Sequence, residues 1–459
     1  MIKLSQNLLE SCKSMIYHEK KFCFDKNVFV MATEICEKNF YDDYVMYENK
    51  GEISIGIGRF ATVIVTPNEI NLEIMGEIQH FKKNDISIEL KEIFKSIDLK
   101  NWRAYGIANF GLACHNYKLP LRDENKSLIK MFIPKIDIRL VENKILVRAL
   151  DTKDLSRVEK FIEKLENNLG KKEDLQNELN KIKLKVPEIL EQKAETYKDI
   201  VSKGVEDIKS RKYEKVILSR KILLNQRIDM LHSYIIGRRE NSPARSYALN
   251  LGGLKVIGYS PETVAEVSRD GYVSTFPLAG TRAMGKNREE TKKLKEELLA
   301  DPKEIAEHAV SVKLAYEELE KVCELNSVSV IKFMSVLERG TVQHLASRLK
   351  GKLKEEFNEW HAFNALFPAV TASGIPKKQS IDAIIRLENE ARDLYSGSVL
   401  TYDFDGTMDA SLVLRSVYQD EENTWLRAGA GIVELSKPER ELEETREKLR
   451  SVSKQLVNL

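Results

Sequence analysis

Residues 246–280 read SYALNLGGLKVIGYSPETVAEVSRDGYVSTFPLAG, and residues 215–224 before them read KVILSRKILL. Both stretches are rich in β-branched and aromatic residues, which favour strands. Helical patterns follow at roughly 286–325 and 376–393. After them come a strand pair that turns at Asp405–Gly406, a strand in 424–434 and a final helix from about Lys437. Because strand runs and helix runs do not alternate strictly, the pattern predicts an α+β fold with a largely antiparallel sheet.

The part of the chain before these strands is mixed α/β. Residues 51–67 alternate in polarity, and residues 133–150 have the pattern of a hairpin around Glu142–Asn143. A strongly charged stretch from about 151 to 213 predicts amphipathic, solvent-facing helices, one of them ending at Gly170. Its apolar residues recur at helical spacing: Phe161, Leu165 and Leu169. We interpret this stretch as the joint between an N-terminal region, 1–180, and a catalytic region, 181–459.

Composition restricts the class of protein. The 459 residues are 42% hydrophobic and 31% charged, which allows a sizeable core under a well-solvated surface. A net charge of +2 gives no reason to expect nucleic acid or a membrane as partner. The five cysteines form no CxxC pair, so neither a disulfide framework nor a thiolate metal site is indicated. With no apolar leader at the start, we expect a cytoplasmic protein.

Three motifs resemble functional sites that their context does not support. The glycines of GIGRFA at 56–61 mimic a dinucleotide loop, but another strand pattern follows where a helix is required, so we expect a turn in a sheet. The DFDGT stretch at 403–407 mimics a phosphatase nucleophile loop, but Asp-Gly between apolar runs predicts a hairpin. EIAEH at 304–308 lacks the first histidine of an HxxEH zinc helix, so its oxygen donors favour Mg²⁺ or a similar hard ion.

Two helices carry paired glutamates one turn apart. The first begins at Asp301-Pro302, where Asp is a good N-cap and Glu304 falls at the capping-box position. Glu304 therefore has two open explanations, capping and metal binding, whereas Glu307 on the same face has no capping role. The last helix begins with a second predicted capping box, Ser436 to Glu439, and carries Glu441, Glu444 and Lys448 on one face. From spacing alone, ordinary solvated Glu/Lys pairs remain the simpler interpretation.

Other segments have the chemistry of an anion site. PLAGTR at 277–282 ends a strand with small residues, whose backbone N–H groups can approach a carboxylate closely. Arg415 interrupts the apolar strand DASLVLRSVY, and its guanidinium can bind either a substrate carboxylate or an internal acid. Lys215 begins a strand, where partial burial would favour the neutral amine of a useful base, but from position alone a lysine at the surface is the better interpretation.

The order of these motifs resembles that of the chorismate-utilising enzymes, the anthranilate synthase component I-like family. The resemblance covers about 213–449, over half of the chain. The matching motifs are KVILSR, GYSPE, PLAGTR, DPKEIAEH, FMSVLERGTVQHLAS, LFPAVTASGIPK, LYSG, SLVLRSVY, WLRAGAGIVE and ERELEETREKL. The family resemblance implies a single large domain with an intertwined, mainly antiparallel core flanked by helices, to which residues 1–180 contribute.

Subfamily positions favour salicylate synthase. Members of the family that use water as nucleophile carry a lysine where this chain has Lys215, and anthranilate synthases typically do not. Aminodeoxychorismate synthases have a lysine where this chain has Ala279, and isochorismate synthases usually have a different segment around Thr371. Isochorismate synthase remains the nearest alternative, ahead of anthranilate synthase component I and a non-catalytic chorismate-binding protein.

The resemblance also implies a mechanism. Lys215 would activate a water that attacks C2 of chorismate, and Glu262 would protonate the departing C4 hydroxyl. Pyruvate elimination from isochorismate would then give salicylate, for use in siderophore biosynthesis. The implied Mg²⁺ ligands are Glu307, Glu441 and Glu444, with Glu304 as a further candidate. The implied substrate-binding residues are Gly280, Thr281, His344, Thr371, Tyr395, Arg415, Gly429, Ala430, Gly431 and Lys448. We expect a monomer with no obligate protein partner.

Overall fold

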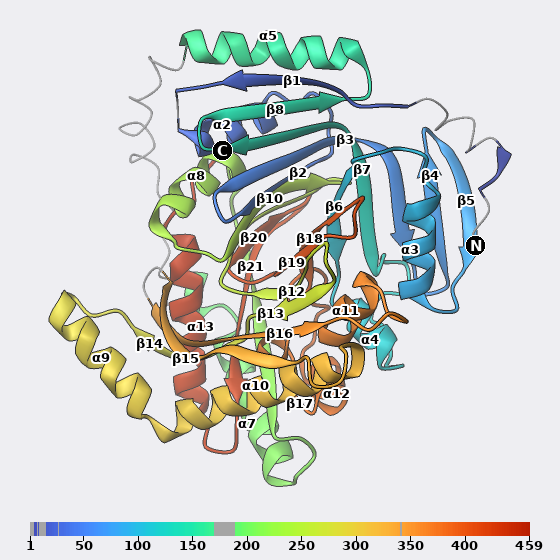
Figure 1. The fold of residues 1–459 in the computed structure, drawn as a ribbon. Helices are drawn as coiled ribbons and strands as arrows, with labels where there is room; N and C mark the ends of the chain where they lie inside the picture. Colours follow the sequence, from blue (N-terminus) through green and yellow to red (C-terminus); the bar gives the residue numbers. More distant parts are fainter. Residues whose placement is uncertain (1–3, 7, 9–14, 26, 169–188, 340–341) are drawn as a thin grey trace.

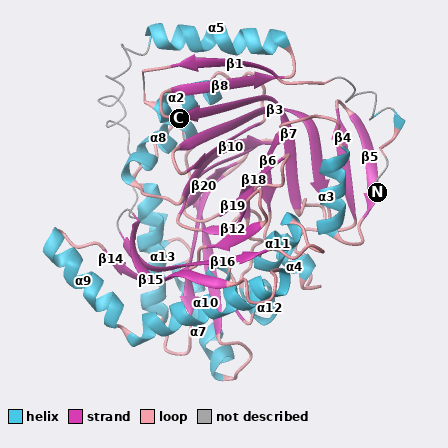
Figure 2. Ribbon diagram, viewed as in Figure 1, coloured by secondary structure: helices cyan, strands magenta, loops and turns pink. Residues whose placement is uncertain are grey.

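The computed structural model describes residues 4–6, 8, 15–25, 27–168, 189–339 and 342–459. Within them, one 21-stranded sheet forms the centre of the molecule, and helices lie around it (Figures 1 and 2). The strand pairings in these residues are antiparallel, from the β1–β8 pair (His18–Cys23 and Lys144–Ala149) to the β21–β9 pair (Thr424–Ile432 and Lys215–Leu224). The predicted α+β class with an antiparallel sheet is therefore confirmed.

The remaining strands fall on both sides of the predicted boundary at residue 180, which itself lies outside the described residues. Those before it are β2 (Tyr44–Asn49), β3 (Glu52–Val65), β4 (Glu69–Ile74), β5 (Glu77–Lys82), β6 (Arg103–Ala108) and β7 (Ile129–Val141). Those after it are β10 (Arg245–Leu251), β11 (Leu254–Ser260), β12 (Thr263–Val267), β13 (Tyr272–Thr275), β14 (Leu278–Ala283), β15 (Ser329–Arg339), β16 (Val342–Lys352), β17 (Gly374–Ile375), β18 (Ser398–Asp403), β19 (Met408–Leu412) and β20 (Ser416–Gln419).

Strands from the two parts of the chain pair directly. β2 pairs with β10, and β6 pairs with β18, so the early strands and the late strands belong to the same sheet. In Figure 1 the red strands β18 to β21 accordingly lie among green and blue ones. Residues before 169 thus build part of the core on which the later strands rest.

The strand order also brings distant strands together. Pairing runs from β17 and β9 through β21, β20, β11, β10 and β2 to β3, and then through β7, β6, β18, β19, β12 and β13 to β16. β9 and β16 are thus far apart in this order, yet residues of both line one cavity. The sheet must therefore fold back on itself, which is consistent with its strong overall curvature in Figure 2.

The helices that matter for this cavity pack on those two ends of the sheet. α13 (Pro438–Ser453) contacts β21 and α7 (Ala194–Lys209), whereas α10 (Pro302–Val322) contacts β14 and β16. α12 (Lys377–Leu387) contacts β9. The other helices are α2 (Val28–Glu37), α3 (Ile86–Ser96), α4 (Gly111–Asn116), α5 (Thr152–Asn168), α8 (Met230–Glu240), α9 (Arg288–Ala300) and α11 (Glu359–Leu366), with 3₁₀ turns η2 (Ile189–Glu191) and η3 (Val370–Ala372).

Both predicted hairpins are present. β7 and β8 join at Glu142, whose φ of 52° is the left-handed conformation of a tight turn. β18 and β19 join through Gly406 at φ 86°, so the DFDGT stretch is a hairpin turn. The predicted helix end at Gly170 lies outside the described residues. No helix in the described part of the chain is both long and apolar enough to cross a membrane.

Three predicted elements differ in their limits. The helix expected over 286–325 is two helices, because Asp301 leaves α9 and caps α10 by accepting from the N–H groups of Lys303 and Glu304. The helix expected over 376–393 ends at Leu387, after which Glu388 takes an extended conformation. The turn expected at 56–61 is instead part of the single strand β3, which absorbs Gly58 at φ 66° through a register shift near Arg59.

The predicted second capping box is also absent. α13 begins after Lys437, which makes no side-chain capping bond, and Pro438 occupies the first turn. The Ser436 hydroxyl instead accepts from the Val433 N–H in the preceding turn. The helix start was predicted within one residue, but the reason for it was wrong.

Candidate active site

The cavity between the two ends of the sheet has a volume of about 110 Å³. Strands β9, β14, β16 and β21 and helices α10 and α13 each contribute side chains to it. Among its lining residues are these sequence-predicted site residues: Lys215, Glu262, Gly280, Thr281, Glu307, His344, Thr371, Tyr395, Arg415, Gly429, Gly431, Glu444 and Lys448. The fold thus gathers most of the predicted site in one place.

Three predicted residues do not line the cavity. Ala430 is fully buried in the apolar core, because neighbouring residues of a strand point to opposite faces and Gly429 and Gly431 occupy the cavity side. Glu304 lies just outside, where its carboxylate accepts a hydrogen bond of 3.0 Å from the Thr281 N–H. Glu441 lies on α13 one turn before Glu444 and is buried.

Lys215 is not a surface lysine. Its side chain is 5% exposed, and its Nζ lies 2.5 Å from Oε1 of Glu307, which is itself 20% exposed. Burial acts to raise the pKa of Glu307, but the Lys215 ammonium outweighs it and holds that pKa below the ordinary value. A short ion pair therefore links the start of strand β9 to helix α10 at the cavity.

Glu262 is a buried carboxyl that lines the cavity. It follows β11, is 3% exposed, and accepts hydrogen bonds from the Thr371 hydroxyl at 2.5 Å and from the Leu278 N–H at 2.8 Å. Burial raises the pKa of this carboxyl to about 7, against the opposing effect of those two hydrogen bonds. A carboxyl with such a pKa is partly protonated near neutrality, which is the property that general acid catalysis requires.

Arg415 contributes a buried positive charge. It lies between β19 and β20 at φ 51°, and its guanidinium donates to Nε2 of His344 at 2.8 Å. Since Arg can only donate, Nε2 of His344 is the unprotonated nitrogen, and its Nδ1–H faces the Thr281 hydroxyl at 2.9 Å. Burial, together with Arg339, lowers the pKa of Arg415 to about 10, and no carboxylate of the described residues forms an ion pair with it. An anionic ligand in the cavity would supply the missing charge.

The helix α13 side of the cavity holds a second lysine. Nζ of Lys448 donates to Oε1 of Glu444 at 2.8 Å and to the Gly429 carbonyl at 2.9 Å. On the same helix, burial and the nearby Glu444 raise the pKa of Glu441 to about 7. Burial and the nearby Glu307 likewise raise the pKa of Glu304. Each helix therefore presents two carboxylates that repel each other.

Close backbone approach explains the glycines of β21. A Cβ atom on Gly429 would lie 2.5 Å from the Leu218 carbonyl of β9, and one on Gly431 would lie 3.2 Å from Cε of Lys215 and 3.3 Å from Oε1 of Glu307. Larger residues would therefore separate the strands or press on the Lys215–Glu307 pair.

The donor set of the two helices fits a hard divalent cation. Glu304, Glu307, Glu441 and Glu444 offer only carboxylate oxygens, and their mutual repulsion is the kind that such a cation relieves. In the described residues no three acidic, histidine or cysteine side chains are close enough together to hold a metal ion. Lys215 and Lys448 instead pair with Glu307 and Glu444. Metal binding would thus require these carboxylates to leave their lysine partners.

Several lining groups escaped sequence reasoning. The Leu278 N–H that binds Glu262 is a backbone group, which no residue pattern reveals. Arg427 also lines the cavity, and it lies within the WLRAGAGIVE motif, where an arginine in a strand facing the interior was a usable signal. The apolar lining residues Ile217, Leu278 and Leu414 have no such signal, because core and cavity residues look alike in sequence.

Comparisons with known proteins agree with this geometry. A family model described as chorismate binding enzyme matches residues 42–454. The chain is 36% identical over 426 residues to a salicylate synthase of Mycolicibacterium paratuberculosis, covering 91% of this chain and 90% of that protein. It is 38% identical over 260 residues to anthranilate synthase component 1 of Aquifex aeolicus, covering 57% of this chain and 52% of that protein.

Solved structures have the same fold at low sequence identity. The menaquinone-specific isochorismate synthase MenF of Escherichia coli matches with a TM-score of 0.70 at 18% identity, covering 98% of both chains. Anthranilate synthase component I of Streptococcus pneumoniae TIGR4 matches with a TM-score of 0.70 at 24% identity, covering 89% of this chain and 92% of that one. Taken with the match over residues 42–454, these findings show that the chain belongs to the family of chorismate-utilising enzymes.

Proposed function

We propose that this enzyme is a salicylate synthase, which converts chorismate to isochorismate and then to salicylate and pyruvate. The observation that carries the proposal is that Lys215 and the protonatable Glu262 line the same cavity. Thr371, whose segment distinguishes salicylate synthases in the resemblance, donates directly to Glu262. The 36% identity to a salicylate synthase over nearly the whole chain supports the same choice.

The first step exchanges one hydroxyl for another. Lys215, once it has given up its ammonium proton, takes a proton from water, whose oxygen bonds to C2 of the ring. Glu262 gives its proton to the C4 hydroxyl, which leaves as water while the ring double bonds shift. A pKa of about 7 at Glu262 makes this proton available near neutral pH. Water enters and water leaves, so chorismate and isochorismate are isomers.

The second step breaks the ether bond to the pyruvyl group. A ring hydrogen moves to the pyruvyl methylene carbon as the C–O bond breaks, which yields salicylate and pyruvate without any added reactant. The protein contributes by holding the reactive conformer and excluding water. Arg415, whose charge has no carboxylate partner in the described residues, would bind the pyruvyl carboxylate together with Tyr395.

Glu304, Glu307, Glu441 and Glu444 would hold Mg²⁺, which when bound supplies positive charge against the repulsion between these carboxylates and a dianionic substrate. In this structure Lys215 pairs with Glu307 and Lys448 pairs with Glu444. If those glutamates bound Mg²⁺ instead, both lysines would be free to face the substrate. The product would serve siderophore biosynthesis.

The test uses the purified protein with chorismate and Mg²⁺, followed by salicylate fluorescence and by coupled detection of pyruvate. Equal amounts of salicylate and pyruvate are the expected result, and excess chelator should abolish turnover. Isochorismate that accumulates without pyruvate would assign the alternative function, isochorismate synthase. No consumption of chorismate would refute both.

A further inference from the structure

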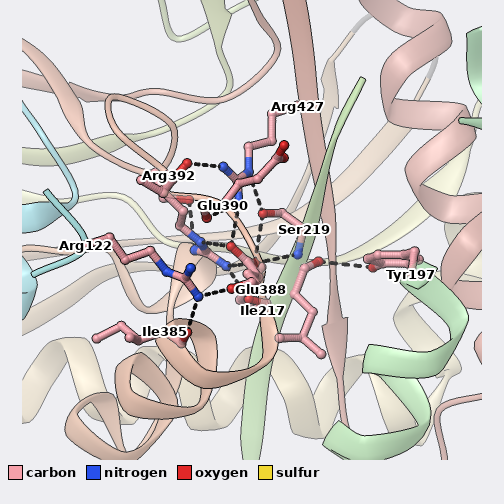
Figure 3. Close-up of polar contacts among 12 residues, drawn as sticks. Arg122, Tyr197, Ile217, Ser219, Ile385, Glu388, Glu390, Arg392 and Arg427 are labelled. Atoms are coloured by element: carbon pink, nitrogen blue, oxygen red, sulfur yellow. Dashed lines mark hydrogen bonds and ion pairs between the residues drawn. The ribbon is translucent and has the colours of Figure 1, made fainter. Parts of the chain in front are cut away.

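A cluster of three buried ions lies against the cavity, on the side of α12. Glu388 directly follows that helix, and its carboxylate accepts a hydrogen bond of 2.6 Å from Nη2 of Arg392 and another of 2.6 Å from Nη2 of Arg427. The side chains of Glu388, Arg392 and Arg427 are 2%, 1% and 3% exposed. Figure 3 shows the carboxylate of Glu388 between the two guanidinium groups. We call these three residues the ion triad.

Arg392 joins the strand that carries the proposed base, Lys215, to the segment that carries Thr371, the hydrogen-bond partner of the proposed acid Glu262. Its Nη2 donates to the Ile217 carbonyl at 2.5 Å, and its Nη1 donates to the Ala372 carbonyl at 2.7 Å. Ile217 lies on β9 two residues after Lys215, and Ala372 follows Thr371. β17 pairs with β9 at Lys215 and Val216, and the Ile217 N–H donates to the Ser373 carbonyl at 2.9 Å. The guanidinium adds a side-chain contact between the same two segments, just beyond this backbone bond.

The other two members leave Arg392 little freedom. Glu388 also accepts from the N–H and the hydroxyl of Ser219 at 2.7 and 2.9 Å, so its carboxylate is saturated with donors. Arg427 donates to the Ser219 hydroxyl at 2.9 Å and to the Ala391 carbonyl at 2.5 Å. Removing water from three charges is costly, and a buried ionic cluster is better suited to fixing one geometry than to adding stability.

The same triad supports the cavity residue Tyr395. The Tyr395 N–H donates to the Arg392 carbonyl at 2.9 Å, which closes a turn between the two residues. The guanidinium carbons of Arg392 and Arg427 lie 5.6 and 5.5 Å from the centre of the Tyr395 ring. Arg392 thus forms a turn with the cavity residue Tyr395. It also donates a hydrogen bond to Ala372, the neighbour of the cavity residue Thr371.

We propose that Arg392 is a positioning residue that holds the Thr371 segment against β9, so that the Thr371 hydroxyl stays on Glu262 opposite Lys215. The ion triad is the support that fixes Arg392 in this role. The inference rests on the proposed function for the catalytic meaning of Glu262, but the geometry that it predicts can be measured without turnover.

Loss of this support should change the surroundings of Glu262 in a defined way. The groups that face its carboxylate are Lys215 from β9, Arg415 after β19, the Thr371 hydroxyl from η3 and the Leu278 N–H from β14. Arg392 contacts the segments of Lys215 and Thr371, and of these two side chains only the Thr371 hydroxyl is hydrogen-bonded to Glu262. A carboxylate that loses one hydrogen-bond donor has a higher pKa, by about 0.5 to 1 unit for an ordinary hydrogen bond.

The experiment follows the titration of Glu262 by pH-difference infrared spectroscopy of its carboxyl band. The band is identified by its absence in Glu262→Gln, which also separates it from the band of Glu441. Arg392→Gln leaves Glu388 and Arg427 as a neutral pair, and Arg392→Lys keeps the charge with a single donor group. Thr371→Val removes the hydroxyl directly. Arg245→Lys is the matched control, because Arg245 is likewise buried, at 3% exposed, and pairs with Asp409 at 2.7 Å away from the cavity.

We expect Thr371→Val and both Arg392 variants to raise the midpoint of the Glu262 band by about 0.5 to 1 pH unit. The double variant Arg392→Gln/Thr371→Val should show no further shift, because both changes act through the same hydroxyl. Consumption of chorismate by the Arg392 variants should fall about tenfold, and Arg245→Lys should change neither quantity.

An unchanged Glu262 midpoint in folded Arg392 variants would overturn the proposal, as would additive shifts in the double variant. Failure of both Arg392 variants to fold would also overturn it, in favour of a purely structural role. If the Arg392 variants shift the midpoint but the unaltered protein consumes no chorismate, the positioning role is supported and the proposed function is refuted. The two failures are therefore distinguishable.

Discussion

Replacement of Glu262 by glutamine should stabilise this protein, and the gain should appear only as the pH rises. The side chain is 3% exposed and its pKa in the folded state is raised to about 7, above the ordinary value of 4.5. The folded protein therefore holds this proton more tightly than the unfolded chain does. The contribution of Glu262 to the stability of the fold is fully present below pH 4.5. It is lost as the pH rises through 7, because the folded state must then bury a carboxylate.

The size of the effect follows from the shift in pKa. A difference of about 2.5 units corresponds to on the order of 3 kcal/mol, lost between about pH 4.5 and pH 7. Glutamine cannot ionise, but its carbonyl oxygen can still accept from the Thr371 hydroxyl or the Leu278 N–H. The variant should thus equal the unaltered protein near pH 4.5 and exceed it by up to about 3 kcal/mol at pH 8.

The assay compares thermal and urea unfolding of the two proteins in steps from pH 4.5 to pH 8.5, without metal and at one protein concentration. Asp409→Asn serves as a control, because it removes a buried carboxylate that pairs with Arg245 at 2.7 Å and should destabilise the protein instead. Burial acts to raise the pKa of Asp409, but Arg245 outweighs it and holds that pKa below the ordinary value. The Glu262→Gln variant should at the same time lose formation of isochorismate. A difference in stability that does not change with pH would refute the account of Glu262 as a carboxyl kept protonated by burial.

Four further outcomes are expected. Glu307→Gln and Glu444→Gln should each lower turnover of chorismate by about 10²-fold or more at the Mg²⁺ concentration that saturates the unaltered protein. Turnover that is restored at higher Mg²⁺ would show that the glutamate strengthens metal binding but is not essential for it. Gly431→Ala should lower kcat about tenfold with little change in KM, because its Cβ would press on Lys215 and Glu307 at 3.2 and 3.3 Å; unchanged kinetics would show that the pair can move aside. Arg415→Met should raise the KM for chorismate at least about thirtyfold while the melting temperature stays level or rises, since a buried charge without a carboxylate partner is removed; a large drop in melting temperature would contradict this reading of the guanidinium. Lys215→Ala should lose formation of isochorismate from chorismate yet still release pyruvate from supplied isochorismate, and equal loss of both would mean that Lys215 serves binding more than water activation.

The electrostatics of the cavity explain why these residues are costly to keep. Lys215 and Lys448 each neutralise one glutamate, Arg415 has a histidine instead of an acid as partner, and Glu262 is buried without an ion pair in the described residues. Such groups lower stability, and under the proposed function they are the groups that an anionic substrate and a cation would pair with. The predictions for Glu262→Gln and Arg415→Met test this from opposite charges.

Local sequence rules were reliable where a turn or a helix start depends on a few neighbouring residues. Asp405-Gly406 predicted its hairpin and Asp301-Pro302 predicted the start of α10, because turn and cap geometry are decided within three or four residues. The same rules failed at Ser436, whose hydroxyl serves the preceding turn. They also failed at Gly58, because a long strand can absorb a left-handed residue through a register shift that depends on its partner strand β7.

Long-range contacts decided what local rules could not. The pattern of 376–393 is helical throughout, yet the helix stops at Leu387 because Glu388 is drawn out to bind Arg392 and Arg427. No residue near Glu388 in sequence reveals Arg427. Lys215 likewise looked like a surface lysine until the fold placed Glu307 beside it, 92 residues away.

The sequence by itself determined the α+β class and the family, and it nominated the residues that we propose for acid, base and metal work, because these depend on residue types and on their order in the chain. Only the tertiary structure decided which of them meet. Strands β9 and β16 are far apart in the sheet order, and the folding of that sheet brings Lys215, Glu262 and His344 around one cavity and leaves Ala430 in the core. The physical reason is that burial and charge pairing are properties of the neighbours in space, and it is those neighbours that raise the pKa of Glu262 and leave Arg415 without an acid.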